Sequence, residues 1–200
     1  MELMKLSKER PFLYRFGKTI LGPIFRLYYN PKIIGKENIL KEGPIIIAGN
    51  HIHLYDQCHS IISTKRIVHY MAKKEYFDDK KVAWFFKGTG CISVNRSQKD
   101  GVSVLKALSI LKKGGAIGIF PEGTRNRTDQ LLLPFKYGAV SLAKKADAYI
   151  VPVAVTGDYK FRSKNLVVRY GKPFKVNEDL KEANDKLYNE IKKLMKKKKV

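Results

Sequence analysis

Two short apolar runs, each ending directly in a block of polar residues, constrain the fold of this chain most. Residues 44–48 (PIIIA) and 116–120 (AIGIF) are continuously apolar, which is typical of strands covered on both faces. Other strand and helix patterns alternate along the chain, with strands at 67–71, 91–94, 149–155 and 166–170 and helices at 102–112, 135–146 and 177–199. This alternation predicts a single α/β domain with a mixed, mostly parallel central sheet flanked by helices.

Charge is the unusual feature of the composition. The 200 residues include 40 Lys and Arg against 18 Asp and Glu, a formal net charge of +22. A surface this basic is expected to meet a polyanion, such as nucleic acid, an anionic membrane or an acidic substrate or carrier. Two cysteines, Cys58 and Cys91, make no disulfide framework and indicate a reducing setting. We see no secretory signal and no run of roughly 18 apolar residues that would span a membrane.

The segment Pro11–Tyr29 has the pattern of an amphipathic helix. On a helical wheel, one arc of about 80° holds the polar residues and a glycine, namely Arg15, Lys18, Gly22 and Arg26. Apolar and aromatic residues fill the remainder, which favours a helix lying in a membrane interface over one packed on the core. Pro23 is expected to kink or split it. We therefore predict a membrane-associating helix or helix pair in residues 1–30 and the main domain, with a basic C-terminal helix, in 31–200.

The first polar block follows the PIIIA run and contains His51 and Asp56. In one continuous helix the two side chains would lie about 140° apart, but a strand–turn–helix brings the carboxylate back to the ring. A carboxylate on one ring nitrogen leaves the other nitrogen free to act as a base. The alternative is a helix cap or a structural hydrogen bond.

Metal binding and covalent catalysis by a cysteine are two further interpretations of this block. The cluster His51, His53, Cys58 and His59 could bind a metal, but no matching cluster occurs elsewhere, so we predict no metal. An acyl-Cys route through Cys58 is conceivable, and a buried, inert Cys58 is favoured over it.

The second polar block follows the AIGIF run and reads Pro121-Glu122-Gly123-Thr124-Arg125. Its glycine permits close backbone approach, its threonine offers a hydroxyl donor, and the planar guanidinium of Arg125 matches a phosphate. The alternative is an exposed loop in which Arg125 pairs with Asp129. Arg96, at the end of the 91–94 strand, is a candidate second cation.

Taken together, the blocks resemble the glycerolipid acyltransferase family, the PlsC-type lysophosphatidate acyltransferases. The resemblance covers roughly residues 27–174 and rests on four blocks in order, which are Asn50-His51 through Asp56, Gly90 to Arg96, Phe120 to Arg125, and Val151-Pro152-Val153. Asn95 departs from the acidic residue usual before the arginine of the second block, and Tyr55 beside Asp56 is also unusual. These two departures leave the acceptor open.

The resemblance implies an O-acyltransferase without an acyl-enzyme. His51 would act as general base on the free sn-2 hydroxyl of lysophosphatidate, with Asp56 orienting it, and general-base help is typically worth about 10²–10⁴-fold. The phosphate would be held by the residues Arg96, Glu122, Gly123, Thr124 and Arg125. Glu122 is expected to orient Arg125 or to bond a glycerol hydroxyl, and backbone N–H groups near the active turn are expected to stabilise the oxyanion.

The resemblance also implies the partners. The product would be phosphatidate for phospholipid biosynthesis, the co-substrate acyl-CoA or acyl carrier protein, and no cofactor is expected. Anionic membrane lipids would bind the basic surface at the cytoplasmic face of the cell membrane, with the protein peripheral or monotopic. The alternatives are another lysophospholipid or polyol acceptor and, more remotely, a nucleic-acid-binding module, against which the absence of any nucleic-acid-binding motif argues. We therefore expect no nucleic-acid partner.

Overall fold

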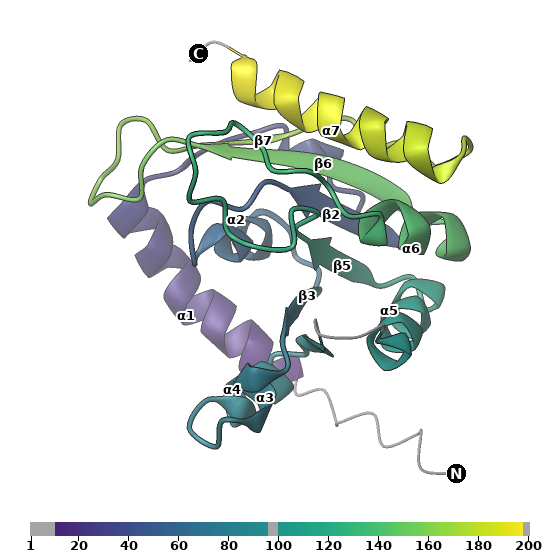
Figure 1. Ribbon diagram of the computed structural model, residues 1–200. Helices are drawn as coiled ribbons and strands as arrows, with labels where there is room; N and C mark the ends of the chain where they lie inside the picture. The colour runs from purple at the N-terminus through teal and green to yellow at the C-terminus, as the bar shows by residue number, and fades with distance from the viewer. Residues whose placement is uncertain (1–10, 96–99, 198–200) are drawn as a thin grey trace.

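The computed structural model describes residues 11–95 and 100–197 and has a seven-stranded sheet at its centre (Figure 1). The spatial order is β1-β7-β6-β2-β5-β3-β4, and every neighbouring pair is parallel except β6 and β7. The prediction of a mostly parallel α/β domain is confirmed. The strands are β1 (Lys32–Ile34), β2 (Ile45–Gly49), β3 (Val68–Lys73), β4 (Ile92–Val94), β5 (Ala116–Ile119), β6 (Tyr149–Thr156) and β7 (Val167–Tyr170).

Helices cover both faces of this sheet. They are α1 (Pro11–Tyr29), α2 (Asp56–Ser63), α3 (Glu75–Asp78), α4 (Ala83–Gly88), α5 (Gly101–Lys112), α6 (Gly138–Ala146) and α7 (Leu180–Lys196), with a 3₁₀ turn η1 (Lys36–Asn38) after β1. Helices α5, α6 and α7 lie on one face, and α1 and α2 lie on the other (Figure 1). The sequence patterns located α1, α5, α6 and α7.

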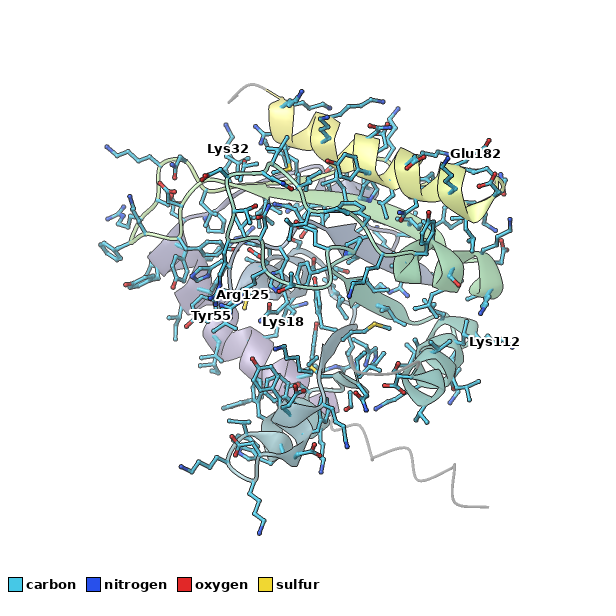
Figure 2. All side chains as sticks on the ribbon, in the orientation of Figure 1. Lys18, Lys32, Tyr55, Lys112, Arg125 and Glu182 are labelled. Carbon is cyan, nitrogen blue, oxygen red and sulfur yellow. The ribbon has the colours of Figure 1, made fainter. Side chains whose placement is uncertain are left out.

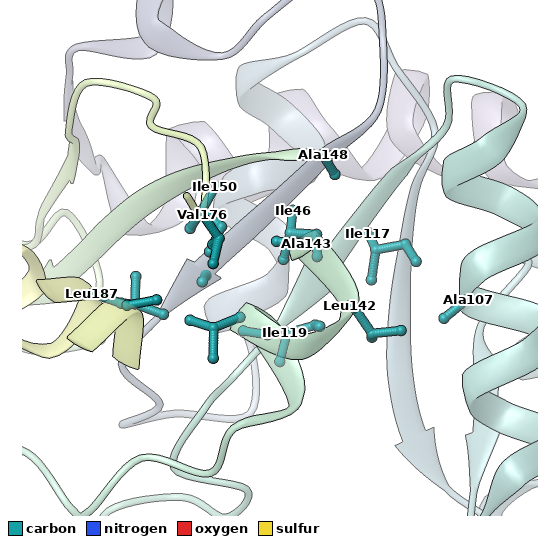
Figure 3. Close-up of a cluster of buried hydrophobic side chains, with 14 of the residues drawn as sticks. Ile46, Ala107, Ile117, Ile119, Leu142, Ala143, Ala148, Ile150, Val176 and Leu187 are labelled. Atoms are coloured by element: carbon teal, nitrogen blue, oxygen red, sulfur yellow. The ribbon is translucent and has the colours of Figure 1, made fainter. Parts of the chain in front are cut away.

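The environment of the central strand β2 explains why apolar and polar residues do not alternate along it. Ile46 and Ala48 belong to the apolar cluster under α5, α6 and α7, part of which is drawn in Figure 3. Ile45 and Ile47 belong to the second cluster, on the face toward α1 and α2. All four side chains are at most 1% exposed. Because both faces are covered, each position of the strand is apolar.

Helix α1 packs on the domain through a narrow stripe. Tyr14 is buried and its hydroxyl accepts from the Val68 N–H at 3.1 Å. The Lys18 ammonium donates to the Thr64 carbonyl at the end of α2. Gly22 is buried, and a Cβ built on it would lie 3.4 Å from Ile62. Two residues of the polar arc therefore face the protein, because glycine permits close approach and lysine reaches an open carbonyl.

The wide apolar face of α1 points away from the domain. Its large side chains are 48–78% exposed, and they are Phe16, Ile20, Leu21, Ile24, Leu27 and Tyr28. The helix runs unbroken through Pro23, contrary to the expected split. Within the described ranges, none of the helices has the length and apolar content to cross a membrane.

Candidate active site

The site forms where β2 and β5 end side by side. These two strands are parallel neighbours, so their carboxyl ends and the loops that follow lie at one edge of the sheet. The Asn50 side chain fixes the start of the first loop, because its amide donates to the Val155 carbonyl and accepts from the Val155 N–H, both at 2.8 Å. Before it, Gly49 is required: a Cβ there would lie 2.5 Å from a Val153 methyl.

His51 and Asp56 meet as their spacing predicts. After β2 the chain turns and enters α2 at Asp56, which brings the Asp56 Oδ2 to 2.8 Å from the His51 Nδ1. The His51 ring stacks on Phe120 with centroids 4.0 Å apart. The side chain is 18% exposed, whereas that of Asp56 is fully buried. Nε2 of His51 has no hydrogen-bond partner among the described residues, so it is the nitrogen open to a substrate.

Four donors converge on the Asp56 carboxylate. Oδ2 accepts from the backbone N–H groups of Ile52 and His53, both at 2.7 Å, in addition to the His51 ring. Oδ1 accepts from the Tyr159 hydroxyl at 2.5 Å. Sequence analysis did not find Tyr159, because it lies 103 residues beyond Asp56 in the loop between β6 and β7, and its surrounding sequence has no recognisable pattern.

Glu122 joins the two blocks to each other. One carboxylate oxygen accepts from the His51 N–H at 2.8 Å, and the other accepts from the Leu133 N–H at 2.8 Å. The Asn126 N–H adds a bond to the His51 carbonyl at 2.7 Å. Glu122 makes no ion pair with Arg125 among the described residues, and its oxygens accept from backbone groups instead. The expected orientation of Arg125 is therefore not seen here, and the alternative bond to a glycerol hydroxyl stays a prediction. Its burial raises the pKa of this carboxyl, an effect that the two N–H donors oppose.

Backbone N–H groups of the turn after β2 also have hydrogen-bond partners within the protein. Those of His51, Ile52 and His53 all donate to carboxylates, so these three groups are not available to stabilise an oxyanion. Oxyanion donors among the other backbone N–H groups near the turn stay a prediction. The N–H of Gly123 closes a turn onto the Phe120 carbonyl at 2.9 Å. Gly123 has a φ of 71°, a left-handed conformation that favours glycine, so its contribution is to shape the loop.

The remaining residues of the second block are free to bind a ligand. Thr124 is exposed, Arg125 is half-buried, and neither side chain makes a hydrogen bond or ion pair with the part of the chain described. The alternative pairing of Arg125 with Asp129 is absent there. Figure 2 labels Arg125 and Tyr55 on the side of the molecule that carries α1. The candidate second cation, Arg96, lies outside the described residues.

Lys136 is a cation that sequence analysis missed. Its exposed side chain runs over Gly123, with Nζ 3.1 Å from where a glycine Cβ would stand. Its backbone N–H donates to the Pro121 carbonyl at 2.9 Å, which places it beside the second block. Sixteen loop residues (120–135) separate Lys136 from β5 in the sequence, and only the turn geometry brings it back beside the second block.

The other ionisable groups of the site favour uncharged forms. Burial raises the pKa of Cys58 to about 11, which keeps it a thiol and supports its interpretation as inert. Burial lowers the pKa of His53, and it lowers that of His59 to about 4. Residues 11–95 and 100–197 contain no group of three or more His, Cys, Asp and Glu arranged to hold a metal ion.

A histidine held by a carboxylate lies next to a loop whose arginine has no partner among the described residues. This arrangement is typical of α/β enzymes that use acid–base chemistry on anionic substrates. Comparison of the sequence with protein families identifies the particular family within that class. The model of the acyltransferase family matches residues 30–156, and the chain belongs to this family.

Relatives with assigned activities agree with the family. The chain is 34% identical over 146 residues to a 1-acyl-sn-glycerol-3-phosphate acyltransferase of Bacillus subtilis, a match that covers 72% of each protein. It is 33% identical to the enzyme of the same name from Borreliella burgdorferi, covering 70% of this chain and 56% of that protein. The crystal structure of the lysophosphatidate acyltransferase PlsC from Thermotoga maritima has the same fold, with a TM-score of 0.74 and 20% identity over 92% of this chain and 79% of that one.

Proposed function

We propose that this chain transfers a fatty acyl group from a thioester donor to the free sn-2 hydroxyl of lysophosphatidate, giving phosphatidate. The observation that carries the proposal is that His51 Nε2 and the Arg125 guanidinium, neither of which has a partner in residues 11–95 and 100–197, lie at the same sheet edge. A base for the hydroxyl and a cation for the phosphate are the two groups that a lysophosphatidate acceptor requires. The names of the relatives support the same acceptor.

The His51–Asp56 pair supplies the proton transfers. Nε2 takes the proton of the acceptor hydroxyl while the oxygen attacks the thioester carbonyl. The fully buried carboxylate of Asp56 stabilises the imidazolium that forms. When the tetrahedral intermediate collapses, the C–S bond breaks and the imidazolium returns its proton to the leaving thiolate. No acyl-enzyme forms, and no resident metal or organic cofactor takes part in this scheme.

Binding of the acceptor phosphate falls to the loop after β5. Arg125 offers a guanidinium with no competing partner among the described residues, and Thr124 offers an exposed hydroxyl. The ammonium of Lys136 lies over the same turn and adds a second positive charge. Glu122 takes no phosphate in this scheme. Its role is to hold the phosphate loop to the backbone of His51, so that base and cations keep a fixed separation.

Both co-substrates are anionic, and the surface is strongly basic. A net charge of +22 attracts acyl-CoA, an acidic acyl carrier protein and anionic lipid alike. The exposed apolar face of α1 fits the acyl region of a bilayer. These features support our proposal that the protein acts at the cytoplasmic face of the cell membrane, bound as a peripheral or monotopic protein.

The decisive experiment is acyl transfer by purified protein in liposomes. Lysophosphatidate is supplied with palmitoyl-CoA or palmitoyl-acyl carrier protein, and phosphatidate is detected by mass spectrometry. We expect product from wild type and none from His51→Ala. His53→Ala is the comparison variant, because it removes a neighbouring imidazole that makes no ring hydrogen bond to Asp56 but stacks on Tyr159. We expect it to lose less activity than His51→Ala. Product from another lysophospholipid alone would move the proposal to that acceptor, and full activity of His51→Ala would reject the mechanism.

A further inference from the structure

A side-chain network behind Asp56 extends the His51–Asp56 pair into the interior. Asp56 Oδ1 is 2.5 Å from the Tyr159 hydroxyl, and that hydroxyl is 2.7 Å from His59 Nε2. Asp56 and His59 are both buried, at 2% and 1% exposure. Tyr159 is held as well by its ring, which stacks on His53 with centroids 4.1 Å apart.

The direction of the hydrogen bonds follows from counting protons. The Tyr159 hydroxyl has one proton, and the carboxylate Oδ1 can only accept, so Tyr159 donates to Asp56. His59 must then donate from Nε2 to the Tyr159 oxygen, which fixes it as the Nε2–H tautomer. Its Nδ1 carries no proton in this tautomer and is a buried nitrogen without a partner in the described structure. Burial raises the pKa of Tyr159 far above its usual value, which keeps the phenol protonated.

We propose that Tyr159, supported by His59, is a positioning residue that holds Asp56 and tunes the basicity of His51. The proposal rests on His51 being the base of the proposed function. Tyr159 ties up Oδ1, so the carboxylate presents Oδ2 to the imidazole and cannot rotate. It also withdraws part of the negative charge that would otherwise favour the imidazolium. The His59 donor polarises the Tyr159 hydroxyl and strengthens its bond to Asp56.

Tyr159→Phe removes one oxygen and keeps the ring stack on His53. We expect kcat to fall about 10- to 100-fold, the range for a hydrogen bond to a charged group, with KM of both substrates changed by less than about twofold. The acidic limb of the kcat profile should move to higher pH, because the returned carboxylate charge favours protonated His51. The other ionisable groups around the pair stay in place in this variant, and they are Tyr29, His53, Cys58, His59, Glu122 and Arg125.

Tyr170→Phe is the matched control. Tyr170 is buried on the same face of the sheet, and its hydroxyl donates to Ser63 of α2 at 3.1 Å, so the variant loses the same atom without touching Asp56. A merely structural role would lower Tm and activity in both variants alike. A kcat profile shifted only in Tyr159→Phe supports the proposal. A profile unchanged in Tyr159→Phe, or shifted equally in Tyr170→Phe, overturns it.

An NMR titration separates this proposal from the proposed function, because it needs no substrate. The chain has four histidines, and single substitutions assign their ring nitrogens. Wild type should show His59 as the Nε2–H tautomer, and His51 should protonate at a lower pH than in Tyr159→Phe. A His59 Nδ1–H tautomer, or identical His51 titrations, would reject the network even if phosphatidate is made. If no phosphatidate is formed, the proposed function fails, but the NMR titration still tests the Tyr159 network.

A second pair of variants covers the case in which Tyr159→Phe does not fold. His59→Gln keeps a nitrogen donor near the position of Nε2, whereas His59→Leu removes it. We expect His59→Gln to retain the wild-type kcat profile and His59→Leu to shift its acidic limb upward. Equal profiles in the two variants would show that the donor to Tyr159 has no effect, which contradicts the proposal.

Discussion

Arg125 carries the charge that the acceptor phosphate should meet. It makes no ion pair among the described residues, so its guanidinium is available to bind the phosphate. Arg125→Ala should therefore raise KM for lysophosphatidate about 10- to 100-fold, the range for a hydrogen bond to a charged group, while kcat changes little. Initial rates across acceptor concentrations measure both constants.

Arg127→Ala supplies the control for Arg125. Arg127 lies two residues further along the same loop and is exposed, so the variant removes an equal charge from the same region. We expect its KM to stay close to that of wild type. Equal increases in the two variants would mean that loop charge in general, rather than Arg125, attracts the acceptor.

His59 should make the fold sensitive to acid. Burial, opposed by Asp56, lowers its pKa from 6.5 to about 4 in the folded protein. The unfolded chain therefore binds more protons between these values, and the free energy of unfolding rises with pH there. The stabilisation is complete above pH 6.5 and is lost as the pH falls toward 4, a difference of about 3 kcal/mol. Urea unfolding at pH 7 and pH 4.5 measures it.

The comparison with His59→Gln isolates that effect from other groups that titrate in acid. Glutamine does not ionise and can still donate to Tyr159, so the acid-induced loss in this variant should be smaller by about 2–3 kcal/mol. Carboxylates lose their contributions equally in both proteins. If the two stability curves ran parallel from pH 7 to 4.5, His59 would not be the group responsible.

The sequence predicted only the local half of the site. His51 and Asp56 could be paired because five residues and one turn separate them. Tyr159 could not, because its place depends on how the loop after β6 folds over the end of β2. Glu122 was found as a residue, but its two backbone contacts were not predicted, because accepting from backbone N–H groups leaves no trace in sequence. Long-range partners of a recognised motif thus require the fold.

Among the helices and strands, those with a long periodic pattern or a continuous apolar run could be predicted from the sequence. The long α1 and α7 and the buried β2 and β5 have clear periodicity and were located to within a few residues. The elements β1, η1, α3 and α4 were missed, because each has only three to six residues and includes a charged residue, unlike the equally short apolar run of β5. Helix α1 is the instructive case: its amphipathic pattern was recognised, but the glycine that turns the polar arc toward α2 was not.

The exposed apolar face of α1 should bind the bilayer. Leu27 and Ile24 are 78% and 57% exposed, so Leu27→Ser with Ile24→Ser removes apolar surface without disturbing the buried stripe. Burying each side chain in lipid is worth about 1.5–3 kcal/mol, so vesicle binding should weaken by about 100-fold or more. Co-sedimentation with phosphatidylglycerol vesicles measures the loss, and circular dichroism checks the fold.

Helix α5 offers a control with the same chemistry. Val102 and Leu105 are 66% and 62% exposed on α5, which packs on the opposite face of the sheet from α1. Val102→Ser with Leu105→Ser should leave vesicle binding near the wild-type level. A loss as large as that of the α1 variant would assign the membrane contact to exposed apolar area in general and not to α1.

Charge and apolar surface together should give the molecule two separable modes of membrane attachment. Most of the net charge of +22 is spread over exposed lysines, many of them at the periphery in Figure 2. Each basic residue near an anionic surface contributes about 1 kcal/mol, and this attraction is screened over about 10 Å at 0.1 M salt and about 3 Å at 1 M. The apolar contact of α1 is not screened.

Salt should therefore divide the two contributions. At 0.1 M KCl we expect far tighter binding to phosphatidylglycerol vesicles than to phosphatidylcholine vesicles, and at 1 M KCl the two affinities should converge on the residual binding that α1 supplies. The α1 double variant should keep its preference for anionic lipid at low salt and lose nearly all binding at high salt. If vesicle binding depended on neither lipid charge nor salt, the basic surface would not contribute to membrane attachment. Its role would then be to attract the acyl donor, and KM for palmitoyl-CoA should rise with salt concentration.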